Sequence, residues 1–315
     1  MATISSPHDS FFRALFGDRQ MAVDYFQSAL PAHIIGLLDF STLRRIPDSY
    51  VSGELEKTMS DVIYTCRRRD GRGSVSVCLL VEHKSRPDKF TPVQVGGYLF
   101  SGYQQQINEG HKKLTPIIPV LFYHGRQKWE YWTLDRLFDD LEDDLLVFLP
   151  KFNYIYHNLR DTPDAVVEAL RNQFLASALL MMKHSHNKVW LARNFQRVLM
   201  ALPSASEMLQ QAFLVYSFLQ VEMNDEQLKE VIEELPLTIK RKVMSTYDLL
   251  IEKGIERGIE QGIEQGIERG TAQKGYAVVA NLIQQLGFDD ETAAGVAEVP
   301  VEFVRKVRED LKKKK

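Results

Sequence analysis

Residues 60–88 read SDVIYTCRRRDGRGSVSVCLLVEHKSRPD, with alternating runs at 61–67 and 74–84 on either side of a turn cluster at 70–73. Two such runs around a turn rich in Gly and Asp are typical of a β-hairpin. Residues two apart on a strand share a face, so the apolar faces match when Val62, Tyr64 and Cys66 lie beside Val75, Val77, Leu79 and Val81. This register puts Asp61, Glu82 and Lys84 together on the other face, whereas a slip of one residue would bury Asp61 among valines.

Two carboxylates and an ammonium on one face of a hairpin are open to two interpretations, because charged groups are rarely buried unless they are paired or bind a metal. In the structural one, Asp61 or Glu82 pairs with Lys84 at the end of the sheet. In the chemical one, Asp61 and Glu82 hold Mg2+ or another divalent cation, since hard cations prefer carboxylate oxygen. Lys84 would then act on an attacking water or on the charge that builds up on a phosphate.

The order of Asp61 and, after the hairpin, Glu82-His83-Lys84 resembles the D…(D/E)xK signature of the PD-(D/E)xK nuclease fold. The sequences HDSFF at 8–12, EHKSRPD at 82–88 and PVLFYHG at 119–125 resemble the recombination-promoting nuclease (Rpn) family, also called the YhgA-like transposases. The resemblance spans roughly residues 5–160. It implies a metal-dependent DNA endonuclease that promotes recombination or acts on foreign DNA, with Asp61, Glu82 and Lys84 in the catalytic roles. Many members of that family carry Gln at the position of Lys84.

Two other functions fit the same fold, namely a catalytically inactive, transposition-linked DNA-binding protein and an oligomeric regulator. Accessory candidates for the nuclease are Gln94 and Tyr98, which are four apart on a predicted helix and share a face, and Glu54, which precedes Asp61. The alternatives for them are a helix that simply packs on the sheet and a surface acid. Four arginines at the hairpin turn are either candidate DNA contacts or a solvated turn that protects a sheet edge: Arg67, Arg68, Arg69 and Arg72.

Histidines near the ends of predicted elements are open to a catalytic or ligand role, and the structural interpretation is favoured. His8 and Asp9 fall in the first turn of a helix that Ser6 caps, where an acid favours the helix dipole, and His124 follows a buried strand.

The fold class expected is α/β, a PD-(D/E)xK-type mixed sheet core with flanking helices, followed by an all-helical C-terminal region. A strand–helix–strand crossover adds a parallel pair to the hairpin. The expected elements are helices from Pro7 and over 19–30, a helix capped by Thr91 that continues to 109, strands at 116–123 and 151–159, and helices from 164 to about 250. The predicted domains are 1–160 (nuclease), 161–247 (helical), 248–275 (repeat helix) and 276–315 (a small helix-turn-helix-like module).

Composition excludes a strongly basic nucleic-acid binder, because the net charge of the 315 residues is −3. DNA contacts must then come from local patches or from metal-bridged phosphates. The chain shows no apolar run long enough to span a bilayer, so we expect no membrane contact and a cytoplasmic protein. Cys66 and Cys78 occupy apolar hairpin positions, which favours buried free thiols in a reducing compartment.

Residues 254–270 read GIERGIEQGIEQGIERG, a four-residue repeat. Glycine costs ~1 kcal/mol relative to alanine in a helix, so five glycines make this helix marginal on its own. Packed against another copy, the isoleucines would be buried, so residues from about Met244 onward are expected to form a homo-oligomerisation module. The alternative is a linker. Beyond the repeat, two short helices joined near Val299-Pro300 are expected.

Overall fold

The computed structural model describes residues 7–46, 60–81 and 87–313. The chain divides into two compact units, Met1–Thr246 and Tyr247–Lys315. The predicted division of the first unit at residue 160 stays a prediction. Among the described residues, no helix combines the length and the apolar character needed to cross a membrane.

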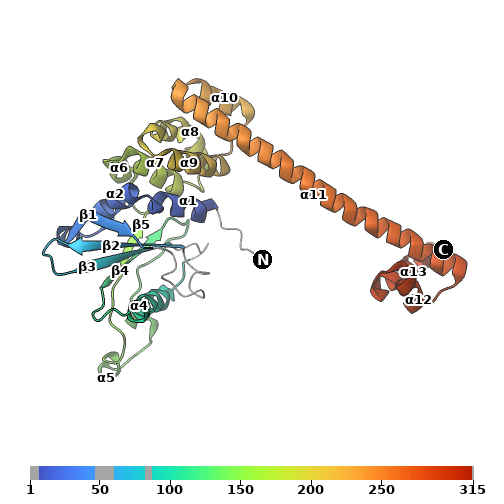
Figure 1. The fold of residues 1–315 in the computed structure, drawn as a ribbon, viewed down its shortest axis with the longest axis horizontal. Coiled ribbons are helices and arrows are strands. Elements are labelled where there is room, and N and C mark those ends of the chain that lie inside the picture. The colour runs from blue at the N-terminus through green and yellow to red at the C-terminus, as the bar shows by residue number, and fades with distance from the viewer. Residues whose placement is uncertain (1–6, 47–59, 82–86, 314–315) are drawn as a thin grey trace. The chain divides into compact units, whose positions relative to one another are not determined.

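The elements follow one another along the chain as in Figure 1. The first part contains α1 (Pro7–Gly17), α2 (Arg19–Ala29), α3 (Ala32–Leu37), β1 (Leu38–Arg45), β2 (Ser60–Arg68), β3 (Ser74–Val81), α4 (Thr91–Asn108), β4 (Ile117–Tyr123), α5 (Asp143–Leu146) and β5 (Ile155–Asn158). The helical part contains α6 (Asp164–Glu168), α7 (Gln173–Lys183), α8 (Lys188–Leu199), α9 (Glu207–Gln220), α10 (Asp225–Glu233), α11 (Leu237–Leu286), α12 (Asp290–Ala297) and α13 (Val301–Lys313). Short 3-10 turns lie at η2 (Asp135–Leu137) and η3 (Leu202–Ser204).

The sheet has the strand order β1-β2-β3-β4-β5. β2 and β3 form the predicted antiparallel hairpin, and Gly71 and Gly73 take positive φ angles of 72° and 101° at its turn. β4 and β5 then add in parallel. The expected mixed α/β fold is therefore confirmed.

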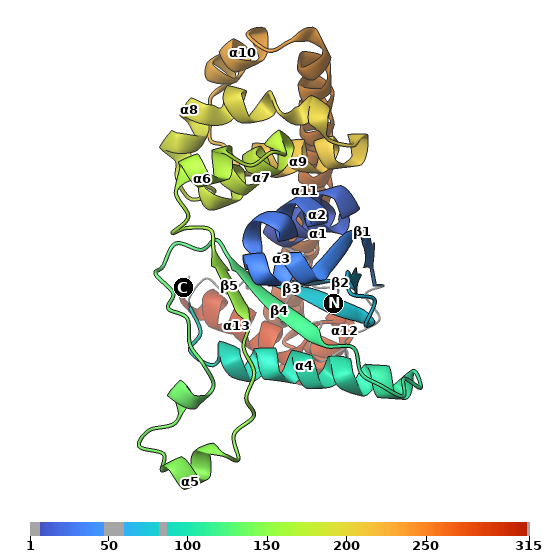
Figure 2. The same cartoon turned by 90° about the vertical axis from the view of Figure 1, so that its left-hand side faces the viewer.

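One face of the sheet is covered by α1 and α2 (Figure 2). Its core is aromatic, with the rings of Phe12, Phe16 and Tyr25 within 5.7–5.9 Å of the ring of Phe122 in β4. Phe11, Phe12, Leu15 and Phe16 are all buried, as the spacing in α1 predicts. Burying a side chain of this size contributes about 1.5–3 kcal/mol, so these two helices are firmly attached to the sheet.

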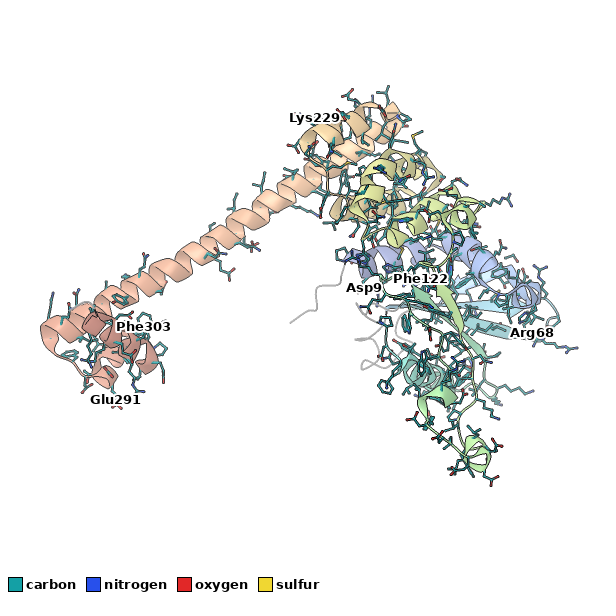
Figure 3. The ribbon with its side chains drawn as sticks, turned by 180° about the vertical axis from the view of Figure 1, so that it is seen from behind. Asp9, Arg68, Phe122, Lys229, Glu291 and Phe303 are labelled. Atoms are coloured by element: carbon teal, nitrogen blue, oxygen red, sulfur yellow. The ribbon has the colours of Figure 1, made fainter. Side chains whose placement is uncertain are left out.

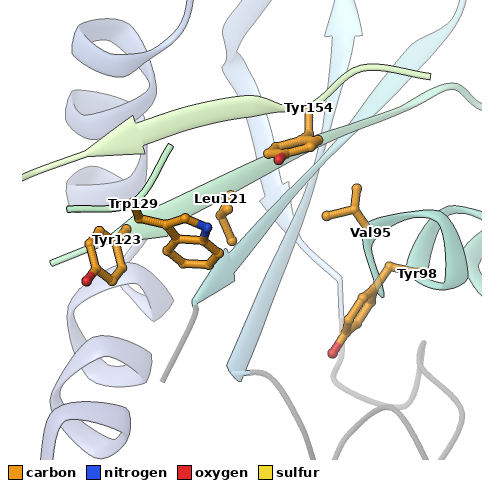
Figure 4. Close-up of a cluster of buried hydrophobic side chains, with 6 residues drawn as sticks. All are labelled: Val95, Tyr98, Leu121, Tyr123, Trp129 and Tyr154. Atoms are coloured by element: carbon orange, nitrogen blue, oxygen red, sulfur yellow. The ribbon is translucent and has the colours of Figure 1, made fainter. Parts of the chain in front are cut away.

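The opposite face is covered by α4, which packs Val95 and Tyr98 against Leu121 of β4 (Figure 4). The same cluster includes Tyr123, Trp129 and Tyr154, and Ile63 of β2 packs against it. The crossover helix therefore lies on the sheet face that contains Ile63 and Leu121.

Three details differ from the expectations. The segment α3–β1 was not predicted at all. Thr91 is the first residue of α4 and not its N-cap, because its Oγ1 donates to the Asp88 carbonyl while Phe90 occupies the cap. The last strand is shorter than residues 151–159, since only Ile155–Asn158 pairs with β4.

Helix α9 packs onto α1, where the Phe11 ring stacks on Tyr216 at 4.5 Å between centroids. Met181 and Met182 of α7 are fully buried in the core. Cys66 is buried and free, as predicted, whereas the side chain of Cys78 lies outside the description.

The second unit has its own core, formed where the end of α11 packs on α12 and α13. Val279, Ala293, Val304 and Val307 are almost fully buried in it. Figure 3 labels Glu291 and Phe303 on the two short helices, which are the pair predicted around Val299-Pro300. Arg308 of α13 donates to Asp290 of α12 at 2.7 Å and fixes one against the other.

The repeat is helical throughout, as part of α11, and those of its side chains that the structure describes are exposed. A Cβ placed on each of its five glycines would meet nothing within 4 Å. Ile255, Ile259 and Ile263 are 58–59% exposed. The apolar row of the repeat thus stays accessible within the described chain.

A pH dependence of stability follows from His157 in β5. The Tyr25 hydroxyl forms a hydrogen bond with Nδ1 of His157 at 2.7 Å, and burial raises the pKa of Tyr25, which keeps the hydroxyl protonated. Burial also lowers the pKa of His157 from 6.5 to about 4. As the pH falls below about 6.5, His157 becomes protonated in the unfolded chain but stays neutral in the folded chain until about pH 4. The free energy of unfolding is therefore highest above about pH 6.5 and falls as the pH drops toward 4.

Between pH 7 and pH 4, His157 should cost the wild type up to about 3 kcal/mol of unfolding free energy. We expect His157→Asn, which keeps an acceptor but cannot titrate, not to show this part of the loss. Urea unfolding at several pH values measures the loss. His33→Asn, at an exposed histidine of α3, is the matched control. Parallel pH curves for the wild type and His157→Asn would contradict the prediction.

Candidate active site

The register of the hairpin matches the sequence prediction. Val62 lies opposite Leu79 and Tyr64 opposite Val77, so the apolar positions of the two strands coincide. Asp61 lies opposite Leu80, and the alternative slip of one residue is absent from the pairing. Val62 and Tyr64 are fully buried on the face of α1 and α2, which leaves position 61 on the other face.

The pairing continues across the sheet as one row, in which Asp61 is opposite Leu80, Leu80 opposite Leu121 and Leu121 opposite Tyr156. Neighbouring strands lie about 4.8 Å apart, so the backbones of Asp61 and Leu121 are separated by roughly 10 Å. Because register partners share a face, position 61 belongs to the face that α4 covers through Val95 and Tyr98.

Only the backbone of Asp61 is described, and Glu54, Glu82 and Lys84 lie outside the described residues. In the described part of the chain, no three His, Cys, Asp or Glu side chains are arranged to hold a metal ion. The metal and catalytic assignments of these residues therefore stay predictions.

The accessory candidates on α4 lie at its first turns. Tyr98 is buried against Leu121, on the face of position 61. Gln94 donates Nε2 to Asp88 Oδ2 at 3.3 Å. Its Oε1 is buried and accepts no hydrogen bond from the described residues. A buried amide oxygen without a donor costs about 1–3 kcal/mol.

The arginines of the hairpin turn divide into two pairs. Arg68 donates to Asp70 at 2.5 Å and Arg69 donates to the Leu38 carbonyl at 2.8 Å, so both stabilise the turn. The Arg72 amide, followed by the Arg68 guanidinium, holds the pKa of Asp70 below its usual value. Arg67 and Arg72 are exposed.

The turn also lies far from Asp61. Asp61 is the second residue of β2 and Arg67 is near the other end of this strand, and six steps of about 3.3 Å place them roughly 20 Å apart. The arginines therefore cannot contact a group that is bound at Asp61.

A group that the sequence did not predict lies where β4 ends. The ring of His8 in α1 is 5.2 Å from that of His124 and 6.2 Å from that of His186, which follows α7. Tyr216 of α9 hydrogen-bonds to Nδ1 of His8 at 2.9 Å. Residues from four segments meet here, so only the tertiary fold reveals this histidine cluster, which consists of His8, His124 and His186.

The comparisons with known proteins agree with this core. The fold is a mixed α/β sheet with an antiparallel hairpin, a parallel crossover and helices on both faces. The family model described as "Putative transposase, YhgA-like" matches residues 6–213. The chain belongs to this family.

Curated relatives carry related names. The chain is similar to recombination-promoting nuclease RpnA of Escherichia coli K12, with 32% identity over 38% of this chain and 41% of the relative. It is similar to RpnD of Escherichia coli O157:H7 with 30% identity, over 42% of this chain and 50% of the relative. It is also similar to the inactive recombination-promoting nuclease-like protein RpnE of strain K12, with 27% identity over 59% of this chain and 61% of the relative.

The chain thus spans about half the length of the curated relatives that it matches. No solved structure matches it.

Proposed function

We propose that the chain is a metal-dependent DNA endonuclease. The observation that carries the proposal is the hairpin register, in which Asp61 lies opposite Leu80. Glu82 follows Leu80 by two residues in the sequence, so a continuation of the strand would put the two carboxylates on one face. Two relatives named as recombination-promoting nucleases support the same activity. DNA cleavage in recombination or against foreign DNA is the matching role.

The donor set fits a hard cation. Asp61 and Glu82 would hold Mg2+ through carboxylate oxygens, with Gln94 Oε1 positioned on α4 to accept a hydrogen bond from bound water. Bound there, the metal would supply charge stabilisation and an activated water for phosphodiester hydrolysis. Lys84 would contact the phosphate oxygens, and Tyr98 would limit access of solvent from the side of α4.

The test is a cleavage assay with purified protein on supercoiled and linear DNA. Nicking or cutting with Mg2+ that stops with chelator supports the proposal. Absence of cutting with Mg2+, Mn2+ and Ca2+ alike, by a folded protein that still binds DNA, supports the second candidate.

That second candidate is an inactive DNA-binding protein on the same fold. It is favoured by one comparison, because the relative named inactive matches over 189 residues whereas RpnA matches over 121. Binding without cutting under every metal condition would distinguish it from the nuclease.

DNA binding through the hairpin turn gives a further prediction. Neutralising Arg67 and Arg72 to Gln should flatten the slope of log Kd against log salt by about 2 units, because each phosphate contact contributes about 0.9. Fluorescence anisotropy with a labelled duplex measures the slope. Lys229→Gln with Arg241→Gln, two exposed cations on α10 and α11, is the matched control.

An unchanged slope would assign the arginines to a solvated turn. Loss of the slope in the control as well would show that net charge, and not the hairpin turn, governs binding.

We also propose that the chain forms a homo-oligomer through the repeat at residues 254–270. The exposed isoleucines at 255, 259 and 263 supply apolar surface, and the uncovered glycines permit close approach of a second helix.

A further inference from the structure

We propose that the histidine cluster is a phosphate-binding site for the nucleic-acid backbone, next to the candidate active site. The inference rests on the proposed function only for the source of the phosphate. Its geometry is independent of Glu82 and Lys84.

The cluster runs from the interior to the surface. His124 is only 7% exposed, His8 is half-buried and His186 is exposed, so a ligand can reach the outer two rings from solvent. Ring centroids 5.2 and 6.2 Å apart leave the imidazoles close enough to donate to oxygens of one phosphate group or of two adjacent ones. Imidazole N–H groups and cationic side chains are the donors that phosphate oxygens accept from.

Tyr216 fixes the orientation of His8. Burial raises the pKa of Tyr216, so its hydroxyl stays protonated and engages Nδ1 of His8 at 2.9 Å. The Phe11 ring, stacked on Tyr216 at 4.5 Å, holds that hydroxyl in place. Because this contact uses Nδ1, a ligand of His8 is bound through Nε2.

Cations surround the exposed end. The pKa of His186 is lowered first by partial burial and then by the positive charges of Arg126 and Lys188, which shows that both cations are close to the ring. Charged groups near the cluster among the described residues include Asp9 next to His8 on α1, Arg126 after β4, Lys188 at the start of α8, and Glu222 after α9, which accepts from Lys188 at 3.1 Å. A phosphate would relieve the repulsion among the cations and favour protonation of His186.

The position suits a DNA backbone. β3 and β4 run in parallel with Val81 opposite Phe122. His124 comes two residues after Phe122, so it lies at the carboxyl end of these two strands. Figure 3 labels Asp9 and Phe122, the chain neighbours of His8 and of this strand end. Two strand spacings across and three residues along place the backbone of His124 roughly 14 Å from that of Asp61. A separation of this size exceeds one step of a nucleic-acid strand, so the cluster would hold a different phosphate from the one at Asp61.

The test uses the full chain in EDTA, so that its result does not depend on cleavage. Histidine side-chain NMR signals are followed while inorganic phosphate, and separately a 20-base-pair duplex, are added. We expect the signals of His8 and His186 to move with saturation and their titration to shift to higher pH. If one histidine takes up a proton when the duplex binds, the affinity for the duplex should rise up to ~10-fold for each unit by which the pH is lowered through the titration range of that histidine.

The variants are His8→Gln with His186→Gln, which should lose most of this pH dependence, and Tyr216→Phe, which keeps the stack on Phe11 and should weaken binding at His8 alone. His33→Gln on α3 is the matched control. Movement with both probes, or with the duplex alone, supports a backbone site, and movement with inorganic phosphate alone supports a site for free phosphate. If neither probe moves the signals of His8 and His186, or if the double variant keeps the full pH dependence, the inference is overturned. Shifted signals in a protein that does not cut DNA with Mg2+ would leave this inference standing while the proposed activity fails.

Discussion

Asp61→Asn protein is expected to lose DNA cleavage by roughly 10³-fold while it keeps its fold, because the loss of one carboxylate ligand removes several kcal/mol of stabilisation of the reacting phosphate. Asn has the shape of Asp and the β2–β3 pairing of residue 61 uses the backbone, so the sheet should be unaffected. Glu82→Ala should cause a loss of the same order. Lys84→Gln should be milder, because Gln keeps a hydrogen-bond donor for the phosphate oxygens and loses only the charge.

The measurement is the single-turnover rate of plasmid nicking with Mg2+ for each variant, with thermal unfolding as a check on the fold. Asp135→Asn, which removes an exposed carboxylate from η2, is the matched control and should cut at the wild-type rate. An Asp61→Asn protein that is folded and cuts normally would remove Asp61 from the active site and with it the assignment of the hairpin.

The hairpin and its neighbours could be predicted because their pattern is local. Alternation in β2 and β3 admits one register that buries Val62 and Tyr64 together, and that register is found. The first helix shows the same agreement, since Phe11 and Phe12 with Leu15 and Phe16 can only form one buried stripe.

The segment α3–β1 could not be predicted because distant contacts stabilise it. The pairing of β1 with β2 shifts register between Asp39 and Arg44. The Arg19 side chain, from α2, donates to the carbonyls of Phe40, Ser41 and Leu43 at 2.7–3.2 Å, where the ladder is irregular. Nothing in residues 38–45 alone indicates that a guanidinium 21–24 residues away satisfies their backbone.

The histidine cluster was missed for the same reason. His8 and His124, taken one at a time, were interpreted as a helix-start residue and a core residue, and the burial of His124 agrees with the second. Their approach depends on α1 packing between the sheet and α9, which is a property of the whole core. The signal in the sequence is that His8 and His124 each lie at an end of a predicted element, and His124 directly follows the strand that ends at Tyr123.

The last prediction concerns the repeat in α11. Replacing Ile255, Ile259 and Ile263 by Asp should convert an oligomer into monomers, because each copy would lose three apolar side chains whose burial contributes about 1.5–3 kcal/mol apiece. These side chains are 58–59% exposed, and five glycines weaken the helix by roughly 5 kcal/mol, so a partner would stabilise both. Light scattering across a dilution series measures the mass.

The sequence also indicates how two copies would align. In an antiparallel pair centred between Gly262 and Ile263, each glycine within residues 258–267 lies opposite an isoleucine of the other copy. Glu256 then lies opposite Arg269 of the other copy. A parallel pair in register would instead set glutamate against glutamate, which is destabilising. Reversing one charge, as in Arg269→Glu, should therefore weaken association, and adding Glu256→Arg should restore it.

Gln284→Asp with Gln285→Asp, at exposed positions of α11 outside the repeat, is the matched control for the isoleucine variants and should leave the mass unchanged. The second unit is compact by itself, so residues 247–315 can be sized alone beside a chain that ends before Met244. An isolated second unit that associates, together with a monomeric shortened chain, confirms that the repeat joins the copies, and a shorter polypeptide beginning at Met244 would then compete for full-length partners. A shortened chain with the full-length mass and a monomeric second unit would instead show that the repeat is a linker, because association would then have to occur within residues 1–243.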